Sequence, residues 1–193
     1  MNEIGVIILA AGASSRMSGS KQMLHVNGES LLRKCTRVVQ NLRCPAVVVL
    51  GHDFETHKAE IIDMDVEITF NLDWKKGMGN SIKYGLNHLH HSNPALKGVL
   101  ITVCDQPHLT THILIDLIKA FDSEEAIVAS YYNNTSGPPV IFGRKYFKEL
   151  LKIDDHKGAK YLISQHGAKR VNFPEGAIDI DTDREWENFK SGF

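Results

Sequence analysis

The sequence has almost no net charge and no long apolar run. Its 22 lysine and arginine residues are balanced by 23 aspartate and glutamate residues, so the formal net charge at pH 7 is −1. This balance provides no overall attraction to nucleic acid or to an anionic membrane, and we expect neither as a partner. The apolar runs are too short to span a bilayer, and no basic segment precedes an apolar one as in a secretory signal. We therefore expect a cytoplasmic protein in which any anion-binding site is local.

Cysteine is scarce. The three cysteines, Cys35, Cys44 and Cys104, form no C-x-x-C pair. An odd count without such pairs argues against a disulfide framework and against a cysteine-based zinc site, so we expect reduced thiols in or near the core. The sequence also lacks internal repeats, low-complexity stretches and any linker long enough to divide it. Its 193 residues are expected to form a single domain over 1–193.

Strand-like and helix-like patterns alternate along the first two thirds of the chain. Their repeated alternation predicts right-handed crossovers and a mostly parallel, twisted sheet with helices on both faces, a three-layer α-β-α architecture. The strand-like runs are Ile4–Leu9, Ala46–Leu50, Val66–Phe70, Gly98–Val103 and Ala126–Ser130, and the helical patterns lie at about 29–42, 54–62, 77–91 and 111–122.

The pattern is looser after Ser130 and predicts a small C-terminal β/α extension. The stretch YYNNTSGPPVIF contains a cluster of turn residues followed by a short strand. The last helix is expected to begin at Thr182 as its cap, with Glu185 three residues later. The other elements expected here are strands at Val140–Phe142, Arg170–Phe173 and Ala177–Ile180 and helices at about 144–152 and 158–165.

The segment LAAGASSRMSGSK ends the first predicted strand, at the edge of a parallel sheet where ligands bind. Ala10, Ala11 and Gly12 have little or no side chain, so a ligand can approach the main chain closely. The main-chain N–H groups that follow, with Arg16 and Lys21, suit a polyphosphate. The segment matches neither the P-loop pattern nor the glycine pattern of dinucleotide-binding folds. On local grounds a solvated surface loop stays open as the alternative.

Carboxylates follow two later strands. Asp105 follows the fourth predicted strand, with Cys104 between them. Mg²⁺ takes one or two protein carboxylates and completes its shell with water and phosphate oxygens, so Asp105 beside the cationic loop predicts a magnesium site. Taken alone, Asp105 also suits a turn. Asp179 and Asp181 alternate along IDIDT and share one face; Asp181 would either complete the metal site or help to cap the last helix.

The segment NLDWKKGMGNS, residues 71–81, follows the third predicted strand. Gly77 and Gly79 open a helix whose free N–H groups suit a phosphate or the edge of a base, and Trp74 suits the shielding of a ring. A hydrophobic staple and helix start explains the segment equally. Three histidines, His88, His90 and His91, lie at the end of this helix. Cations at a helix end interact favourably with the helix dipole, and the spacing does not match a zinc site, so we expect no metal there.

These motifs resemble those of MobA-like nucleotidyltransferases, and more closely those of molybdenum cofactor cytidylyltransferases. The family pattern L-A-A-G-x-S-x-R-M-G-x-x-K is kept in LAAGASSRM…K, except that its glycine stands one place later, as Gly19. The resemblance continues through VVVLGHD, NLDWKKGMGNSIKYG, VCDQP, GPPVIF, KGAKYLI and DIDT, and it implies a Rossmann-like nucleotidyltransferase fold. His156 and Lys160 stand where the family has Asp and Arg, in the segment where the acceptor substrate should bind.

The resemblance also implies roles for the site residues. The catalytic residues would be Asp105, which holds Mg²⁺, Lys21, which stabilises charge on the phosphates, and Arg16, which holds the leaving pyrophosphate. Asp181 would be the second metal contact. The nucleotide-binding residues would be Leu9, Ala10, Ala11, Gly12, Arg16, Lys21, Asn71, Gly77, Gly79 and Ser81.

The implied substrates are CTP and molybdopterin, and the product would pass to a molybdoenzyme or its maturation chaperone. A phosphate monoester is already ionised near neutral pH, because its second pKa is about 6, so no general base is required. Ala11 stands where guanylyl relatives have glycine, so we expect CTP over GTP. Transfer to a sugar phosphate or another small phosphate monoester stays open, as does a nucleotide-binding cofactor chaperone without turnover. A nicotinamide-binding protein is a third alternative, in which Asp53 would bind a ribose. The absence of the glycine pattern of dinucleotide-binding folds argues against it.

Overall fold

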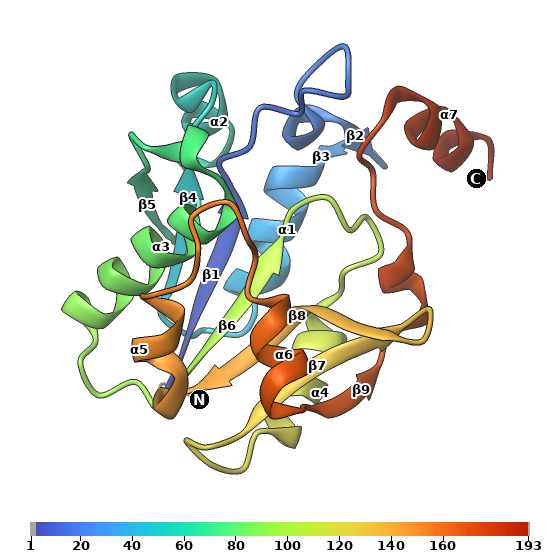
Figure 1. Ribbon diagram of the computed structural model, residues 1–193. Helices are drawn as coiled ribbons and strands as arrows, with labels where there is room; N and C mark the ends of the chain where they lie inside the picture. Colours follow the sequence, from blue (N-terminus) through green and yellow to red (C-terminus); the bar gives the residue numbers. More distant parts are fainter. Residues whose placement is uncertain (1–2, 193) are drawn as a thin grey trace.

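The computed structural model describes residues 3–192 and contains a seven-stranded sheet with helices on both faces (Figure 1). The strands are β1 (Ile4–Ala10), β4 (Ala46–Leu50), β5 (Glu67–Phe70), β6 (Gly98–Val103), β7 (Ile127–Tyr132), β8 (Thr135–Gly143) and β9 (Lys169–Asn172). Their order across the sheet is β5-β4-β1-β6-β8-β7-β9. The first four are parallel, β8 is antiparallel to both of its neighbours, and β9 is parallel to β7. The expected mostly parallel sheet is confirmed.

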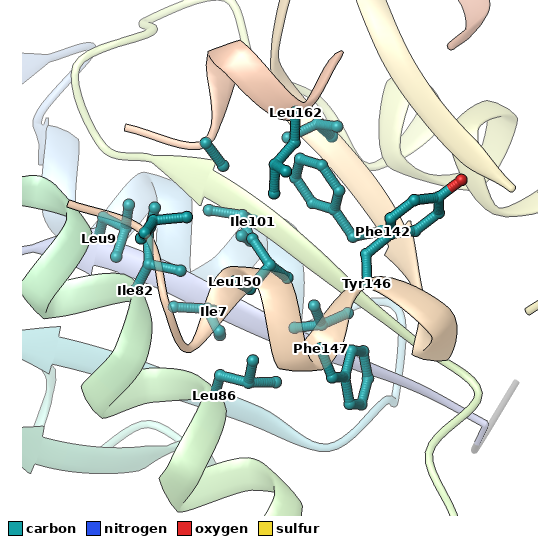
Figure 2. Packing of buried hydrophobic residues seen from close by; sticks show 14 of the residues in the cluster. Ile7, Leu9, Ile82, Leu86, Ile101, Phe142, Tyr146, Phe147, Leu150 and Leu162 are labelled. Carbon is teal, nitrogen blue, oxygen red and sulfur yellow. The ribbon is translucent and has the colours of Figure 1, made fainter. Parts of the chain in front are cut away.

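Helices on the two faces complete the expected three layers. α1 (Leu31–Gln40), α2 (Phe54–Ile61) and α4 (Thr111–Ala120) contribute to the core on one face. α3 (Met78–Ser92), α5 (Phe147–Leu150) and α6 (Lys160–His166) contribute to the core on the other. All seven residues of β1 are buried, as is typical of a strand covered on both faces. Figure 2 shows Ile82 and Leu86 of α3 packing with Phe147 and Leu150 near Ile7.

A smaller cluster joins the C-terminal helix to the region after the first loop. α7 (Asp183–Ser191) lies beside the short hairpin of β2 (His25–Val26) and β3 (Glu29–Ser30) (Figure 1). Ile180, which precedes α7, is fully buried with Val26 and Leu31, and Trp186 packs against them. The chain end is thereby brought next to the loop that follows β1. None of the helices within residues 3–192 is long and apolar enough to cross a membrane.

The strand expected at Ala177–Ile180 is wrong. A 3-10 turn, η4 (Pro174–Ala177), occupies its start, and residues 178–181 form no regular element. Ile180 is apolar between polar neighbours because its side chain is buried in the small cluster. Its N–H donates to the carbonyl oxygen of Asp105 at 3.1 Å. The alternation therefore reflects one buried anchor and not pairing with another strand.

The strand expected at Val140–Phe142 is much longer and forms β8, Thr135–Gly143. Asn133 and Asn134, with φ of 46° and 57°, join β7 to β8 in a two-residue hairpin. Asparagine tolerates this left-handed conformation, which hairpin turns require. The two prolines of β8 lie beside a shift in the pairing register, where a missing N–H is tolerated.

The remaining differences concern element ends. Residues 29 and 30 belong to β3, and Ser30 caps α1 by accepting a hydrogen bond from the N–H of Arg33. The helix expected at 144–152 is a 3-10 turn, η3 (Arg144–Tyr146), followed by α5, and α6 begins at Lys160, two residues after the expected start. The cap of the last helix is confirmed, because the Thr182 hydroxyl accepts from the N–H of Glu185 at 3.2 Å.

Candidate active site

The loop after β1 is held together by one buried amide, that of Gln22. Gln22 is 1% exposed, and its Nε2 donates to the carbonyl oxygens of Ala10 at 3.2 Å and Gly12 at 2.8 Å. Its Oε1 accepts from the hydroxyls of Ser14 at 3.0 Å and Ser20 at 2.8 Å. The loop therefore has internal support that does not depend on a ligand.

The main-chain N–H groups of residues 12–16, in the first part of the same loop, are left unused. Within the part of the chain that the structure describes, no oxygen accepts a hydrogen bond from the N–H groups of residues 12–16. Gln22 occupies the carbonyl oxygens of Ala10 and Gly12, on the other side of the same main chain. A run of unpaired N–H groups with cations nearby is an arrangement that binds phosphate oxygens.

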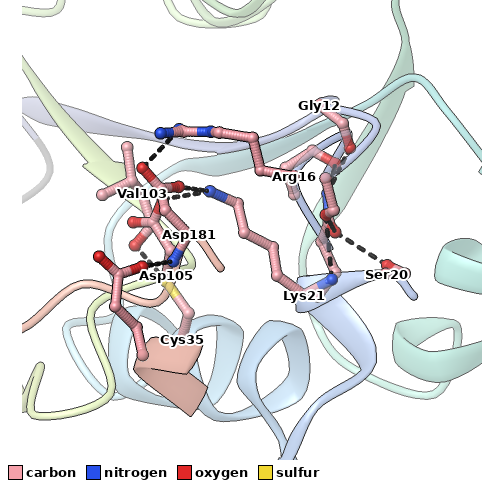
Figure 3. Close-up of polar contacts among 12 residues, drawn as sticks. Gly12, Arg16, Ser20, Lys21, Cys35, Val103, Asp105 and Asp181 are labelled. Carbon is pink, nitrogen blue, oxygen red and sulfur yellow. Dashed lines mark hydrogen bonds and ion pairs between the residues drawn. The ribbon is translucent and has the colours of Figure 1, made fainter. Parts of the chain in front are cut away.

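Four charged side chains meet beyond the ends of β1 and β6 (Figure 3), and we call Arg16, Lys21, Asp105 and Asp181 the ion cluster. Lys21 Nζ lies 2.6 Å from Asp105 Oδ2 and 2.8 Å from Asp181 Oδ1. Arg16 Nη2 lies 2.6 Å from the other oxygen of Asp181, Oδ2. The side chains of Lys21 and Asp105 are each 17% exposed, whereas that of Arg16 is 67% exposed. Lys21 is thus the shielded centre of the cluster and Arg16 its exposed edge.

The cluster controls the ionisation of its members. Burial by itself would lower the pKa of Lys21, but Asp105 and Asp181 outweigh it and raise that pKa above its ordinary value. Burial would raise the pKa of Asp181, but Lys21 and Arg16 hold it below its ordinary value. Asp179 contrasts with its neighbour: burial, Asp105 and Asp181 all raise its pKa. Lys21 and Asp181 are therefore charged at neutral pH.

Asp181 reaches the cluster because the chain around it is tied down on both sides. The N–H of Ile180 donates to the main-chain carbonyl oxygen of Asp105, and the N–H of Asp181 donates to Glu185 Oε2 at 3.0 Å. Thr182, and not the carboxylate of Asp181, caps α7. The expected capping role of the Asp181 carboxylate is therefore wrong, because this carboxylate faces Lys21 and Arg16; its metal contact stays a prediction.

A cavity of about 260 Å³ lies where β1 and β6 end and α3 begins, and we call it the small-residue cavity. Gly77, at φ of +117°, precedes α3 in its wall, and Met78 and Trp74 also line it. The residues predicted to bind nucleotide or metal that line this cavity are Leu9, Ala10, Ala11, Gly12, Lys21, Gly77, Ser81 and Asp105.

A second depression of about 420 Å³, which we call the acidic cleft, adjoins the cavity. Lys21 and Asp105 stand in the walls of both, as do Met78 and Val103. The other polar and charged groups of the acidic cleft include Arg16, Gln106, Tyr132, Asp179 and Asp181. A group held in the cavity next to Lys21 is therefore accessible to a second molecule in the cleft.

Asn71 and Gly79 line neither space. Asn71 is fully buried, its Nδ2 donates to Ser81 Oγ at 3.0 Å, and its Oδ1 accepts from the N–H of Asp73. A Cβ on Gly79 would come within 2.1 Å of the carbonyl oxygen of Asp154. In this structure both residues support the turn and the helix start from which Gly77 and Ser81 face the cavity.

The segment that departs from the family pattern packs on α3. The carbonyl oxygen of Asp155 accepts from the N–H of Asn80 at 3.3 Å, and the Asp155 carboxylate pairs with Lys83. No residue of 154–160, including His156 and Lys160, lines the acidic cleft. The segment lies instead behind Gly77 and Met78, which line the small-residue cavity, and its expected contact with the acceptor stays a prediction.

Sequence reasoning missed Gln22, Met78 and Tyr132. Gln22 directly follows Lys21, but a single glutamine has no spacing that predicts its four hydrogen bonds, which depend on how the loop folds back. Met78, which is 50% exposed, and Tyr132 come from segments distant in sequence that only the fold brings to Lys21. For Tyr132, the sequence signal that was available is the pair of turn-forming asparagines that follows it, Asn133 and Asn134.

The acidic groups suit a hard divalent cation. Asp105 and Asp181 both contact one nitrogen, so a single cation can bridge them, and their ligand atoms are oxygens, which Mg²⁺ and Mn²⁺ prefer. Among residues 3–192, no group of three or more His, Cys, Asp or Glu side chains forms a complete metal site. Phosphate and water oxygens would therefore have to complete the shell. The histidine group at the end of α3 takes no part, and His88 pairs with Glu67 at 2.5 Å.

Curated proteins are similar to this chain over most of its length. It is 35% identical over 153 residues to the bifunctional protein GlmU of Mycolicibacterium vanbaalenii, a match that covers 75% of this chain and 30% of GlmU. It is 26% identical over 195 residues to the purine catabolism protein PucB of Bacillus subtilis, covering 94% and 93% of the two chains. It is 24% identical over 194 residues to a probable molybdenum cofactor guanylyltransferase of Bacillus cytotoxicus, covering 93% and 89%. The chain spans about a third of the length of its GlmU relatives.

Solved structures share the fold. A nucleotidyl transferase from Methanothermobacter thermautotroptrophicus superposes with a TM-score of 0.82 at 17% identity, covering 100% of this chain and 98% of that one. Rv0371c of Mycobacterium tuberculosis H37Rv, in complex with manganese, superposes with a TM-score of 0.78 at 22% identity, covering 99% and 100%. At these identities the likeness shows the architecture.

The family described as the MobA-like NTP transferase domain matches residues 6–171. That range contains most of β1, the loop with Arg16 and Lys21, the residues of the small-residue cavity and Asp105, and it ends before Asp181. The chain therefore belongs to the MobA-like NTP transferases, a family of nucleotidyltransferases.

Proposed function

We propose that this protein transfers CMP from CTP to the phosphate of molybdopterin and releases pyrophosphate. The observation that carries the proposal is the position of Lys21 and Asp105 in the walls of both the small-residue cavity and the acidic cleft. Transfer between two substrates requires that both reach one phosphorus atom in a fixed geometry. The boundary between cavity and cleft provides such a place.

The nucleotide would occupy the small-residue cavity, with its phosphates along residues 12–16. The unpaired N–H groups there donate to phosphate oxygens, and Lys21 stabilises the charge that develops at the α-phosphate. Arg16, at the exposed edge, holds the pyrophosphate as it departs. These roles use positioning and charge, and they require no covalent intermediate on the protein.

The acceptor would approach through the acidic cleft. An oxygen of its phosphate forms a new bond to the α-phosphorus, the bond from that phosphorus to the bridging oxygen breaks, and pyrophosphate leaves with the electron pair. The acceptor phosphate is ionised near neutral pH, since its second pKa is about 6, so no side chain has to remove a proton. This agrees with the absence of histidine from the described residues that line either space.

Asp105 and Asp181 would hold Mg²⁺, which when bound neutralises charge on the triphosphate. The oxygen-only donor set supports this assignment, and manganese in the Rv0371c structure supports a divalent metal in the fold. Asp105 contributes from the end of β6, and Asp181 contributes from the segment that Ile180 anchors.

Ala11 supports CTP as the nucleotide. Its side chain is 5% exposed and lines the cavity, and its carbonyl oxygen accepts from the N–H of His52 at 3.1 Å, so its position is restrained. A methyl group here narrows the cavity relative to glycine, which favours a pyrimidine over a larger purine. Molybdopterin as the acceptor is supported by the name of the guanylyltransferase relative.

Pyrophosphate release by the purified protein tests the proposal. The assay compares CTP, GTP, ATP and UTP, each with Mg²⁺ and molybdopterin. We expect release with CTP and slower release with GTP; equal rates, or a preference for GTP, contradict the choice of base. Turnover with a sugar phosphate and not with molybdopterin would assign the other acceptor class. Normal release by an Asp105→Asn protein would contradict the site.

A further inference from the structure

Lys21 occupies the position between two carboxylates that a divalent metal would need. Its Nζ contacts Asp105 Oδ2 and Asp181 Oδ1, and the second oxygen of Asp181 is taken by Arg16. Both oxygens of Asp181 are therefore engaged. The cluster is satisfied by cations of the protein itself, and a metal ion entering alone would have to replace them.

We propose that Lys21 blocks the metal site of Asp105 and Asp181 until a nucleotide binds, so that the metal enters only together with the triphosphate. This inference rests on the proposed function for the position of the triphosphate. Lys21 would then have two partners in turn: the carboxylates in the nucleotide-free protein, and the phosphates in the complex.

The exchange follows from charge and reach. A divalent ion placed between these oxygens would meet the Lys21 ammonium at contact distance, where like charges repel strongly in a shielded site. The triphosphate offers Lys21 a new set of anionic oxygens, and the flexible four-carbon stem lets the ammonium move to them. Because each ligand removes an obstacle to the other, nucleotide and metal should each increase the other's affinity by the same factor.

Arg16 is not the blocking group. Its side chain is 67% exposed, and within the described residues it pairs with Asp181 only. Lys21 alone contacts both carboxylates, with a side chain that is 17% exposed. Removal of the Lys21 charge should therefore open the site far more than removal of the Arg16 charge.

Binding of Mn²⁺ in the absence of any nucleotide tests the proposal, with free Mn²⁺ followed by electron paramagnetic resonance. Lys21→Met keeps an apolar stem of similar length and should bind Mn²⁺ roughly tenfold or more tightly than the parent protein, because two carboxylates lose a contacting cation. Arg16→Gln should gain less. The double variant Lys21→Met with Asp105→Asn should lose the gain, which shows that the new site uses Asp105. Lys83→Met, which breaks the Lys83–Asp155 pair outside the cluster, is the matched control and should match the parent.

Equal Mn²⁺ affinity in the parent and Lys21→Met proteins would overturn the proposal, and so would a gain that survives Asp105→Asn. Lys21→Gln serves as a second variant, and circular dichroism confirms that each variant is folded. The titration contains no nucleotide and measures no turnover. The two proposals can therefore fail separately. If Lys21→Met binds Mn²⁺ more tightly but the parent protein releases no pyrophosphate from any nucleotide, the blocking role of Lys21 stands and the proposed function is wrong.

Discussion

The small-residue cavity and the acidic cleft share Lys21 and Asp105, but their other walls are of opposite character. The cavity is lined by the end of β1 and the two residues after it, Leu9–Gly12, of which Ala10, Ala11 and Gly12 have small or no side chains. The cleft adds Asp179 and Asp181. The unpaired N–H groups of residues 12–16, of which Gly12 lines the cavity, attract phosphate, whereas the carboxylates of the cleft repel it unless cations intervene. The comparison indicates that the nucleotide phosphates belong on the loop side and that substrates on the cleft side depend on Lys21, Arg16 or a metal.

The largest expected effect comes from the shared boundary. Asp105→Asn keeps the shape but removes the charge that faces Lys21, and we expect pyrophosphate release to fall roughly a hundredfold to a thousandfold. The steady-state rate at saturating CTP measures it. Asp63→Asn, which breaks an ion pair with Arg33 outside both spaces, is the control and should retain the parent rate. A loss of only a few-fold in Asp105→Asn would remove Asp105 from the reaction.

The next effect concerns the support of the cavity wall. Gln22→Leu removes the amide partner of two carbonyl oxygens and one of the partners of the Ser14 and Ser20 hydroxyls, so the free energy of unfolding should fall by about 2 kcal/mol. Chemical denaturation measures this fall, and the KM for CTP should rise as the loop loses its shape. The exposed Gln165→Leu serves as the control. An unchanged KM in a destabilised Gln22→Leu protein would mean that the amide supports the fold but not the phosphate loop.

A third prediction isolates ligand contact from folding. A Cβ on Gly12 or on Gly19 meets no atom within 4 Å, and neither glycine has a positive φ, so both alanine variants should fold normally. Gly12 lines the cavity and Gly19 does not. Gly12→Ala should therefore weaken CTP binding about tenfold, or about 1.4 kcal/mol, and Gly19→Ala should leave it unchanged, as measured by calorimetry. Equal affinities in the two variants would place the nucleotide away from the end of β1.

The smallest expected effect comes from Asp179, a cleft carboxylate whose pKa is raised. Burial, Asp105 and Asp181 favour protonated Asp179 in the folded protein, so its pKa exceeds the ordinary value of 3.8. The folded state then holds its proton to higher pH than the unfolded state, and the charged form costs stability as pH rises through that interval.

Asp179→Asn removes this cost. The variant should match the parent well below pH 3.8, where Asp179 is neutral in both states, and should become more stable as pH rises. Because Asp179 is only partly shielded and solvent still screens its charge, the gain at pH 7 should be only a few tenths of a kcal/mol. Thermal unfolding at pH 3 and pH 7 measures it. A gain of the same size at both pH values would exclude a charge effect.

The parallel half of the sheet could be predicted from the sequence because β1, β4 and β6 are predominantly apolar runs. β4 was predicted with both its ends, Ala46–Leu50, and β6 with both its ends, Gly98–Val103. β8 was not, because its prolines read as a turn and its pairing depends on the hairpin at Asn133. The buried Ile180 gave residues 177–180 the alternation of a strand although the segment pairs with none.

The candidate site also has features that the sequence could predict and features that it could not. Arg16, Lys21 and Asp105 follow strand ends, where ligands of parallel sheets gather, and their convergence was predictable from that rule. The hydrogen bonds of Gln22 and the pairing of both Asp181 oxygens were not, because they depend on how the loop after β1 meets the chain beyond β9. Asn71 and Gly79 show the converse: a motif position can support the site from behind its wall.

A crystal structure with a non-hydrolysable CTP analogue and Mn²⁺ tests the central claim most directly. The account predicts the base in the small-residue cavity, manganese on Asp105 and Asp181, identified by its anomalous scattering, and Lys21 Nζ on a phosphate oxygen. A nucleotide bound elsewhere, or Lys21 still between the two carboxylates with the nucleotide in place, would contradict it.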